Sequence, residues 1–345
     1  MIEKIYEAFW LFRQEINRKK LKENKIEIPN FLNVLRNIQY DKDKEQVFDM
    51  FYPKTKKDIK LPTIVHIHGG AYIAGLKDSY AEYCKILAEY GYCVINFDYI
   101  RGIRKGFPSP VFDFFKFFEF IKNNEEYSKH IDFDKFVLSG DSSGGHIASL
   151  IANIQTNEKL KNAFNLTGGP DVKACVLTSP MLGVYRFNNN WPKIPFEKVV
   201  FKEYYNSPLK DFTHNLETVS DKFPPTIILS AKNDFIKLHA YMFHEKAKEL
   251  NLYLEHYCLT TGKHLGHCCP LIYPNDYENT IALEKIVLFV KKALTEKLSS
   301  ELKYDLIDNT KERDKQFYNA QEILMPIYDE NAKPVYLQDL EMEND

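Results

Sequence analysis

The 345-residue sequence lacks several features that would place it in other classes of protein. Its formal net charge is only −2, so no overall field favours nucleic acid or an anionic membrane as a partner. No stretch approaches the ~18 consecutive apolar residues that a membrane helix needs. Six cysteines spread over so long a chain do not form a disulfide framework. We therefore expect no nucleic-acid partner and no stable membrane insertion.

The amino-terminal stretch MIEKIYEAFWLFRQEINRKK has a charge every few residues, unlike a signal peptide. We therefore expect a cytoplasmic protein whose cysteines are reduced. The composition is that of a globular protein, with 44% hydrophobic and 27% charged residues. Its length suits one large α/β domain with additions, or two ordinary domains. The oligomeric state has no signature in the sequence.

Short apolar stretches alternate with helix-like stretches from residue 46 onward. The predicted strands cover residues 46–53, 61–70, 92–99, 135–140, 174–179, 226–231 and 253–259. The predicted helices cover residues 79–90, 111–123, 144–157, 237–250 and 280–298. Short apolar strands that alternate with amphipathic helices predict a mostly parallel sheet covered by helices on both faces.

Three segments stand apart from this alternation. In residues 1–37, apolar side chains recur at helical spacing, which predicts a helix packed on the main body or a cap over a pocket. The main domain would then span residues 38–298. Within it, residues 181–223 are rich in asparagine, proline and aromatic residues, and an insertion of that length is commonly a lid. The polar tail, 299–345, is expected to be partly disordered or wrapped on the surface.

The stretch KFVLSGDSSGGHIASLIANI contains the candidate nucleophile. Residues Gly140 to Gly144 fit the pattern G-x-S-x-G, directly after a predicted strand and directly before a predicted helix. The spacing places Ser142 at the apex of a tight, strained turn, with Ser143 as the rival hydroxyl. The alternative interpretation is a strand-to-helix turn in which the serine only caps the helix.

The stretch HIHGGAY, at the end of an earlier predicted strand, can hold an oxyanion. Because Gly69 and Gly70 carry no side chains, backbone N–H groups can turn towards a shared point. A tetrahedral intermediate needs such donors where its negative charge develops. We predict that the donors are the N–H groups of Gly70, Ala71 and Ser143. His66 and His68 would allow metal ligation, but we expect His68 to shape the turn by hydrogen bonds.

The pair HGGAY and, about seventy residues later, GDSSGG resembles the hormone-sensitive-lipase-like esterase branch of the α/β-hydrolase superfamily. The resemblance covers roughly residues 38–295 and includes NFDYIRGIRKGFPSPVFD, which departs from the family pattern at Ile100 and in the GIRKG run. Ala71 replaces the third glycine of the usual H-G-G-G but still offers an N–H group. The resemblance implies an α/β-hydrolase fold, and we expect the amino-terminal helix and the insertion to form its cap. It also implies a Ser-His-Asp triad that works without a metal or cofactor.

Chain order in this superfamily puts the acid after the nucleophile and the base last. Asp234 follows the predicted strand 226–231, where the family carries its triad aspartate, whereas the alternatives Asp211 and Asp221 lie in the insertion. The base would follow the strand 253–259, within TTGKHLGHCC. His267 is the favoured base, because LGHCCPLIYP resembles a form found in bacterial relatives. His264 is the rival base.

The stretch TTGKHLGHCC also has the residue types of a metal site, but not the spacing. Only two residues separate His264 from His267, and adjacent Cys268 and Cys269 cannot readily point at one metal. We expect the cysteines to be small buried or half-buried residues.

We therefore expect a serine hydrolase that cleaves carboxylic esters with short to medium acyl groups through an acyl-enzyme. The substrate would be a small molecule. The aromatic residues proposed for the pocket wall, for which core packing is the alternative, are Tyr72, Phe107, Tyr185, Trp191 and Tyr204. The alternative functions are an amidase, an arylformamidase or another acyl hydrolase with the same triad. A ligand-binding protein that has the fold but no activity is the remaining alternative.

Overall fold

The computed structural model describes residues 26–54, 59–183 and 196–307, together with Ala8, Phe12 and two short strands, β10 (Ile327–Tyr328) and β11 (Pro334–Val335). Of the predicted amino-terminal helix, residues 1–25 other than Ala8 and Phe12 therefore lie outside the described residues. Residues 184–195 of the predicted insertion, with Tyr185 and Trp191, also lie outside them.

In the described part of the chain, one nine-stranded sheet has the order β1-β2-β4-β3-β5-β6-β7-β8-β9. The strands are β1 (Leu32–Gln39), β2 (Val47–Pro53), β3 (Leu61–Ile67), β4 (Cys93–Phe97), β5 (Ile131–Asp141), β6 (Val172–Thr178), β7 (Thr226–Ala231), β8 (Leu254–Leu259) and β9 (Leu302–Ile307). Strand β2 is antiparallel to both of its neighbours, and every other pairing is parallel. The mostly parallel sheet predicted from the alternation is confirmed.

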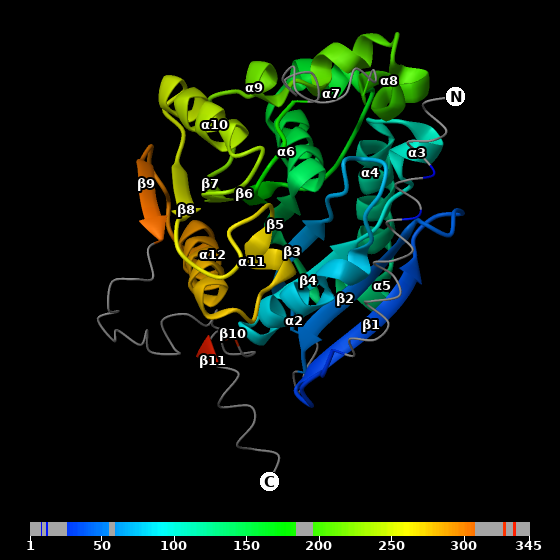
Figure 1. Ribbon diagram of the computed structural model, residues 1–345. Coiled ribbons are helices and arrows are strands. Elements are labelled where there is room, and N and C mark those ends of the chain that lie inside the picture. The colour runs from blue at the N-terminus through cyan, green and yellow to red at the C-terminus, as the bar shows by residue number, and fades with distance from the viewer. Residues whose placement is uncertain are drawn as a thin grey trace.

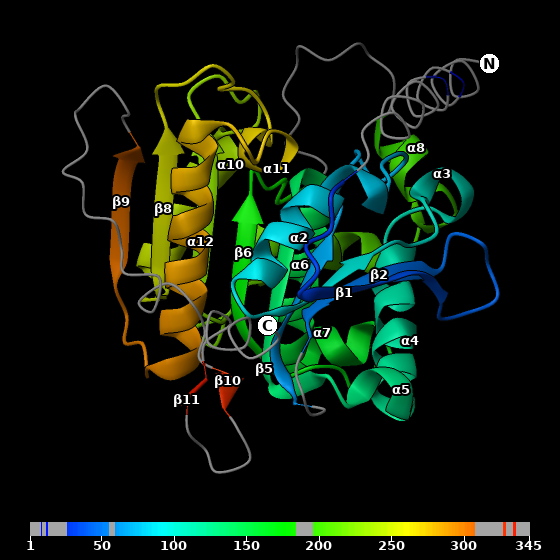
Figure 2. The same ribbon diagram turned by 90° about the horizontal axis from the view of Figure 1, so that it is seen from below.

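Helices cover both faces of this sheet, as Figures 1 and 2 show. One face carries α2 (Ala81–Glu89) and α12 (Tyr277–Thr295). The other carries α4 (Ser109–Asn123), α6 (Ser142–Thr156) and α10 (Leu238–Glu249). Each face has its own buried cluster of apolar side chains, and strands β3, β4, β7 and β8, between the two clusters, are buried along their whole length.

The sheet extends beyond the predicted domain at both ends. Helix was expected as far as Asn37, but Leu32–Gln39 form the edge strand β1, so that expectation is wrong for residues 32–37. Leu302–Ile307, expected to belong to a disordered or surface-wrapped tail, form the opposite edge strand β9. Strands β1 and β9 contain several polar residues. Their extended structure depends on pairing, of β1 with β2 and of β9 with β8, more than on their composition.

The described part of the insertion is helical and lies beside the turn that follows β3. It consists of α8 (Phe196–Phe201), two 3-10 turns, η2 (Lys202–Tyr204) and η3 (Pro208–Thr213), and α9 (Asn215–Thr218). Helix α8 packs against α3 (Gly102–Lys105), and the side chain of Val199 is buried with those of Ile73 and Ile103. Figure 1 shows α8 next to α3. The insertion is thereby anchored next to the candidate oxyanion turn.

The strand register gathers the predicted site residues at one edge of the sheet. Ile67, at the end of β3, pairs with Gly140 near the end of β5, so the glycine turn begins beside the nucleophile turn. Ala231, at the end of β7, pairs with Leu259 at the end of β8, so the loops that carry the candidate acid and base are neighbours. Ligands of open α/β sheets bind outside the carboxyl ends of the strands.

Two further expectations concern the cysteines and the membrane. All six cysteines fall within the described residues, where they are buried and form no disulfide. Among the helices of the described residues, none combines the length and the apolar character needed to cross a bilayer.

Candidate active site

Ser142 sits at the sharp turn where β5 passes directly into α6. Its backbone has a φ of 52°, in the left-handed region that a residue with a side chain adopts only when its surroundings enforce it. The side chain is nearly buried, with 8% of the residue exposed. The turn therefore has the conformation of a nucleophile elbow, with the serine at the amino terminus of a buried helix.

Gly144 allows the helix to approach the neighbouring strand. A Cβ at this position would lie 2.0 Å from the carbonyl oxygen of Ile67, at the end of β3. No side chain fits there, so the second glycine of G-x-S-x-G is required by close packing rather than by backbone conformation. Gly140 is similarly tight, since its Cβ would lie 2.5 Å from the carbonyl oxygen of Gly144.

The turn after β3 presents two N–H groups without partners. Gly70, Ala71 and Tyr72 have φ values of 130°, 54° and 66°, so three consecutive residues have left-handed φ. The N–H of Gly69 donates to Asp141 Oδ1 (2.8 Å) and that of Tyr72 to Ser143 Oγ (3.1 Å). Within the described residues, no acceptor takes the N–H groups of Gly70 and Ala71. These are two of the three predicted oxyanion donors.

Two carboxylates hold this turn in shape. Asp141, directly before Ser142, also accepts a hydrogen bond from the hydroxyl of Tyr80 (2.7 Å). Burial raises the pKa of Asp141 above its ordinary value, despite these hydrogen bonds. Asp98, at the end of β4, lies 2.9 Å from Nε2 of His68, whose Nδ1 lies 2.7 Å from the carbonyl oxygen of Gly69. The imidazole of His68 is therefore fully used in shaping the turn.

His66 is buried under the same turn. Its Nδ1 lies 3.1 Å from the hydroxyl of Ser139, and burial lowers the pKa of His66 to about 3. Burial likewise lowers the pKa of His146 to about 3 and that of His256 to about 4, so all three imidazoles are neutral near pH 7. Among the described residues, no cluster of His, Cys, Asp and Glu side chains has the arrangement of a metal site.

The candidate acid and base are hydrogen-bonded to each other. Nδ1 of His267 lies 2.9 Å from Oδ1 of Asp234, which follows β7, and the same oxygen accepts the N–H of Ile236 (3.0 Å). Burial opposes ionisation of Asp234, but its hydrogen bonds and the adjacent imidazole outweigh burial and lower its pKa. The side chain of His267 keeps 24% of its surface exposed, whereas that of Asp234 is fully buried.

The segment after β6 joins this pair to the nucleophile turn. The hydroxyl of Ser179 accepts the N–H of Cys268, and the N–H of Met181 donates to the carbonyl oxygen of Ser142 (3.1 and 2.9 Å). No hydrogen bond joins the Ser142 hydroxyl to His267 in the part of the chain that the structure describes. Such catalytic hydrogen bonds are often long before substrate binds and shorten in the complex.

The rival base, His264, is engaged elsewhere. Its Nδ1 lies 2.5 Å from Oδ2 of Asp276, at the amino terminus of α12, and its ring stacks on Tyr273 with the ring centroids 3.9 Å apart. The loop after β8 therefore carries His267 and His264, each paired with its own aspartate. The aspartate of the first pair follows a sheet strand at the nucleophile edge, whereas the second ties the loop to α12.

The two cysteines that follow His267 are buried. Burial raises the pKa of Cys268 well above its ordinary value and that of Cys269 to about 12, so both are neutral thiols. Cys268 has a left-handed backbone, which turns the chain into α11 (Cys269–Ile272).

Sequence reasoning missed three residues that support the site: Asp98, Asp141 and Ser179. Each is a polar residue at or just after the end of a buried strand, and that position was the available signal. Of the proposed pocket-wall aromatics, Tyr72 and Phe107 are fully buried and pack against each other, with ring centroids 4.7 Å apart. Tyr204 is half-buried and stacks on Phe112.

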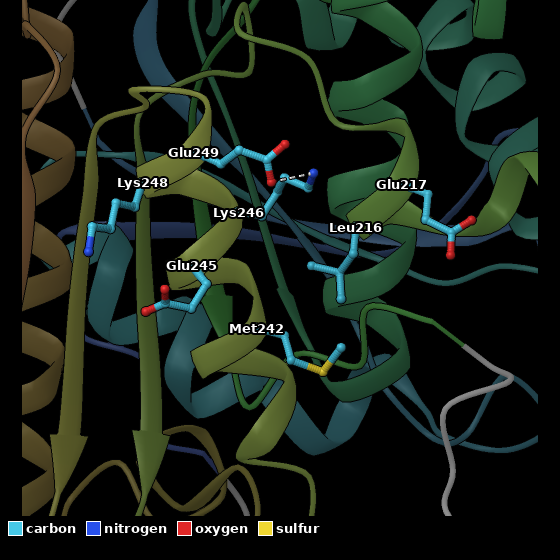
Figure 3. A pocket seen from close by; sticks show the side chains of 7 residues that line it. All are labelled: Leu216, Glu217, Met242, Glu245, Lys246, Lys248 and Glu249. Atoms are coloured by element: carbon cyan, nitrogen blue, oxygen red, sulfur yellow. Dashed lines mark hydrogen bonds and ion pairs between the residues drawn. The ribbon is translucent and has the colours of Figure 1, made fainter.

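A separate pocket of about 1000 Å³ lies between α9 and α10 and is open to solvent (Figure 3). Its lining is mostly charged: Leu216, Glu217, Met242, Glu245, Lys246, Lys248 and Glu249. Helix α10 starts near Asp234 and runs away from it, and the lining residues belong largely to its far half. The pocket therefore contains none of the candidate catalytic residues.

A mostly parallel sheet with a left-handed turn at Ser142 after β5, and with the hydrogen-bonded Asp234 and His267 after β7 and β8, has the arrangement of an α/β-hydrolase. A solved esterase B from Lactobacillus rhamnosis has a TM-score of 0.73 with this chain at 19% identity, and the match covers 85% of this chain and 95% of that one. The α/β-hydrolase fold predicted from the motifs is thereby confirmed. The family model described as BD-FAE matches residues 48–246, more than half of the chain, so the protein belongs to that family.

Curated relatives include enzymes and a receptor. An esterase from Fusarium pseudograminearum is 26% identical over 197 residues, which cover 54% of this chain and 59% of the relative. A gibberellin receptor from Arabidopsis thaliana is 30% identical over 110 residues, which cover 31% of each protein. The chain spans about three fifths of the length of the fungal esterase that it matches.

Proposed function

We propose that this protein is a serine hydrolase that cleaves carboxylic esters of small molecules, with Ser142, His267 and Asp234 as its triad. The observation that carries this proposal is the His267–Asp234 hydrogen bond (2.9 Å) at the same sheet edge as the Ser142 elbow. The unpartnered N–H groups of Gly70 and Ala71 support it, since they lie in the turn tied to Asp141 and Ser143.

The proposed reaction proceeds through an acyl-enzyme. His267 takes the proton of the Ser142 hydroxyl as its oxygen attacks the acyl carbon. The oxyanion then accepts hydrogen bonds from the N–H groups of Gly70, Ala71 and Ser143. His267 returns the proton to the leaving alcohol, and water repeats the sequence to release the acid. Asp234, with its lowered pKa, stays ionised and stabilises the imidazolium. None of these steps uses a metal or cofactor.

Phe235 marks the alcohol side of the proposed site. Its ring packs against His267 with the ring centroids 4.6 Å apart, yet 63% of the residue is exposed. Because His267 delivers its proton to the leaving alcohol, that alcohol must pass beside Phe235. Apolar alcohol groups would cover this surface, so esters of such alcohols are the proposed substrates. The acyl group, short to medium in length, would lie on the side of the insertion, which we propose acts as a lid.

The competing functions are an amidase or arylformamidase with the same triad, and a binding protein without activity. The similarity to a gibberellin receptor over 110 residues gives the second alternative its support. The complete His267–Asp234 pair favours an enzyme. We further propose a cytoplasmic location, consistent with six buried cysteines that form no disulfide.

The test compares turnover of p-nitrophenyl acetate, longer acyl esters and N-formyl substrates by the purified protein, with Ser142→Ala as the control. We expect the short esters to be hydrolysed fastest and the Ser142→Ala variant to be folded and inactive. Faster turnover of N-formyl substrates would replace the esterase by an amidase. Absence of any turnover would favour the binding protein.

A further inference from the structure

Tyr72 ends the oxyanion turn in a conformation that its own backbone disfavours. Its φ of 66° follows that of Ala71 at 54°, and each such residue costs about 1–3 kcal/mol that the surrounding structure must offset. The backbone of Tyr72 is held on both sides. Its N–H donates to Ser143 Oγ at 3.1 Å, and its carbonyl oxygen accepts the N–H of Gly102 at 2.6 Å.

The side chain of Tyr72 is held from the nucleophile helix. Its hydroxyl, fully buried, forms a short hydrogen bond with Nδ1 of His146, one turn after Ser142 on α6. The sulfur of Met181, at the start of the insertion, lies 3.1 Å from the same hydroxyl. An imidazole nitrogen is a far better acceptor than a thioether, so the hydroxyl proton belongs to the His146 contact.

His146 is a buried imidazole that the proposed reaction does not use. Its Nε2 lies 2.6 Å from the carbonyl oxygen of Thr213, the last residue of η3. A carbonyl oxygen only accepts, so Nε2 carries the proton of the neutral ring and Nδ1 is left as the acceptor for the hydroxyl of Tyr72. The tautomer is thereby fixed, and one imidazole links the oxyanion turn to the insertion.

We propose that Tyr72 and His146 are positioning residues for the oxyanion hole. A chain of hydrogen bonds from Tyr72 through His146 to Thr213 holds the Gly70–Tyr72 turn so that the N–H groups of Gly70 and Ala71 face the substrate. The inference rests on the proposed esterase function, since it concerns the turn that would bind the oxyanion of the ester. Neither side chain touches substrate. Their effect is exerted through the placement of the N–H groups of Gly70 and Ala71, which belong to the main chain and are left in place when the side chains of Tyr72 and His146 are changed.

The test uses Tyr72→Phe, which removes only the hydroxyl, and His146→Leu, which removes the ring that receives it. Removing a whole oxyanion donor lowers kcat by about 10²- to 10³-fold, so a displaced turn is expected to lower kcat by about 10- to 100-fold. The KM should change by less than about threefold, because the ground-state ester depends little on the hole. The rate of inactivation by a fluorophosphonate should fall in parallel with kcat, since its phosphonyl oxygen occupies the same position.

Two further variants separate positioning from general destabilisation. The double variant Tyr72→Phe/His146→Leu should lose no more activity than the worse single variant, because both break one chain. The control is Tyr92→Phe, which removes another fully buried hydroxyl, bonded to the carbonyl oxygen of Val287 on α12, and should leave kcat unchanged. Thermal unfolding of every variant confirms that each is folded at the assay temperature.

The outcomes distinguish this inference from the function it rests on. If Tyr72→Phe retains wild-type kcat, or if the losses of the single variants multiply in the double variant, the positioning role is overturned while the esterase stands. If the wild-type protein turns over no ester and reacts with no fluorophosphonate, the function and the positioning role are overturned together.

Discussion

Separate replacement of His264 and His267 by alanine tests which of two histidine–aspartate pairs is catalytic. The pair His267–Asp234 lies at the nucleophile edge of the sheet, whereas His264–Asp276 ties the loop to α12. Loss of the general base is expected to lower kcat/KM by at least about 10⁴-fold, or about 5.5 kcal/mol of transition-state stabilisation.

Loss of His264 removes a partly exposed contact, in which the side chains of His264 and Asp276 are 29% and 28% exposed. Such a pair contributes at most about 1 kcal/mol to the free energy of unfolding. Because the variant should stay folded and keep the proposed triad, its kcat/KM should fall by less than about fivefold. The assay is initial-rate hydrolysis of p-nitrophenyl acetate, with urea unfolding of both variants alongside. A larger loss of activity in His264→Ala than in His267→Ala would refute the assignment and transfer the base to His264.

Three further predictions follow from the packing, the buried charges and the proposed alcohol side. Gly144→Ala places a Cβ 2.0 Å from the carbonyl oxygen of Ile67 and should lower the free energy of unfolding in urea by more than about 3 kcal/mol. Gly266→Ala is the control, because its Cβ would meet no neighbouring atom within 4 Å, and it should change that free energy by less than about 0.5 kcal/mol. Equal effects of the two variants would contradict the close packing at Gly144. His66, His146 and His256 have pKa values below the value near 6.5 of an unfolded chain, so the unfolded state binds more protons than the folded state as pH falls. Each should therefore lower the free energy of unfolding by up to about 1.4 kcal/mol per pH unit below pH 6.5. A free energy of unfolding that stays constant from pH 7 to pH 5 would contradict this. Phe235→Ala should lower kcat/KM for aryl acetates by about tenfold more than kcat/KM for ethyl acetate, since about 1.4 kcal/mol of apolar contact with the aryl alcohol is lost. An equal loss for all esters would mean that Phe235 only supports His267.

The strands and helices of the sheet's centre could be predicted from the sequence because they are buried on both sides. Their apolar stretches, broken by glycines and followed by amphipathic helices, leave little choice of structure. The edge strands were not predicted. In β9, Leu302, Tyr304 and Leu306 alternate with polar residues, as in a strand with one apolar face. Tyr304 and Leu306 are nevertheless 44% and 52% exposed, so this alternation is not enforced by a buried core.

The candidate site was predictable where a motif dictates backbone geometry. The left-handed backbone at Ser142 and the close approach at Gly144 follow from G-x-S-x-G. The supporting contacts were not predictable, because they join residues far apart in the chain whose proximity depends on strand register. The contact between Asp141 and Gly69 depends on the pairing of β3 with β5. The pairing of His264 with Asp276 depends on where α12 begins, which no local pattern indicated.

The most direct test of the central claim is labelling of the protein with a fluorophosphonate, followed by peptide mapping of the modified residue. We expect a single stoichiometric adduct on Ser142, formed at a rate that falls at least about 10³-fold in His267→Ala and is little changed in His264→Ala. An adduct on Ser143, or no adduct on protein that is folded, would contradict the assignment of Ser142 as the nucleophile.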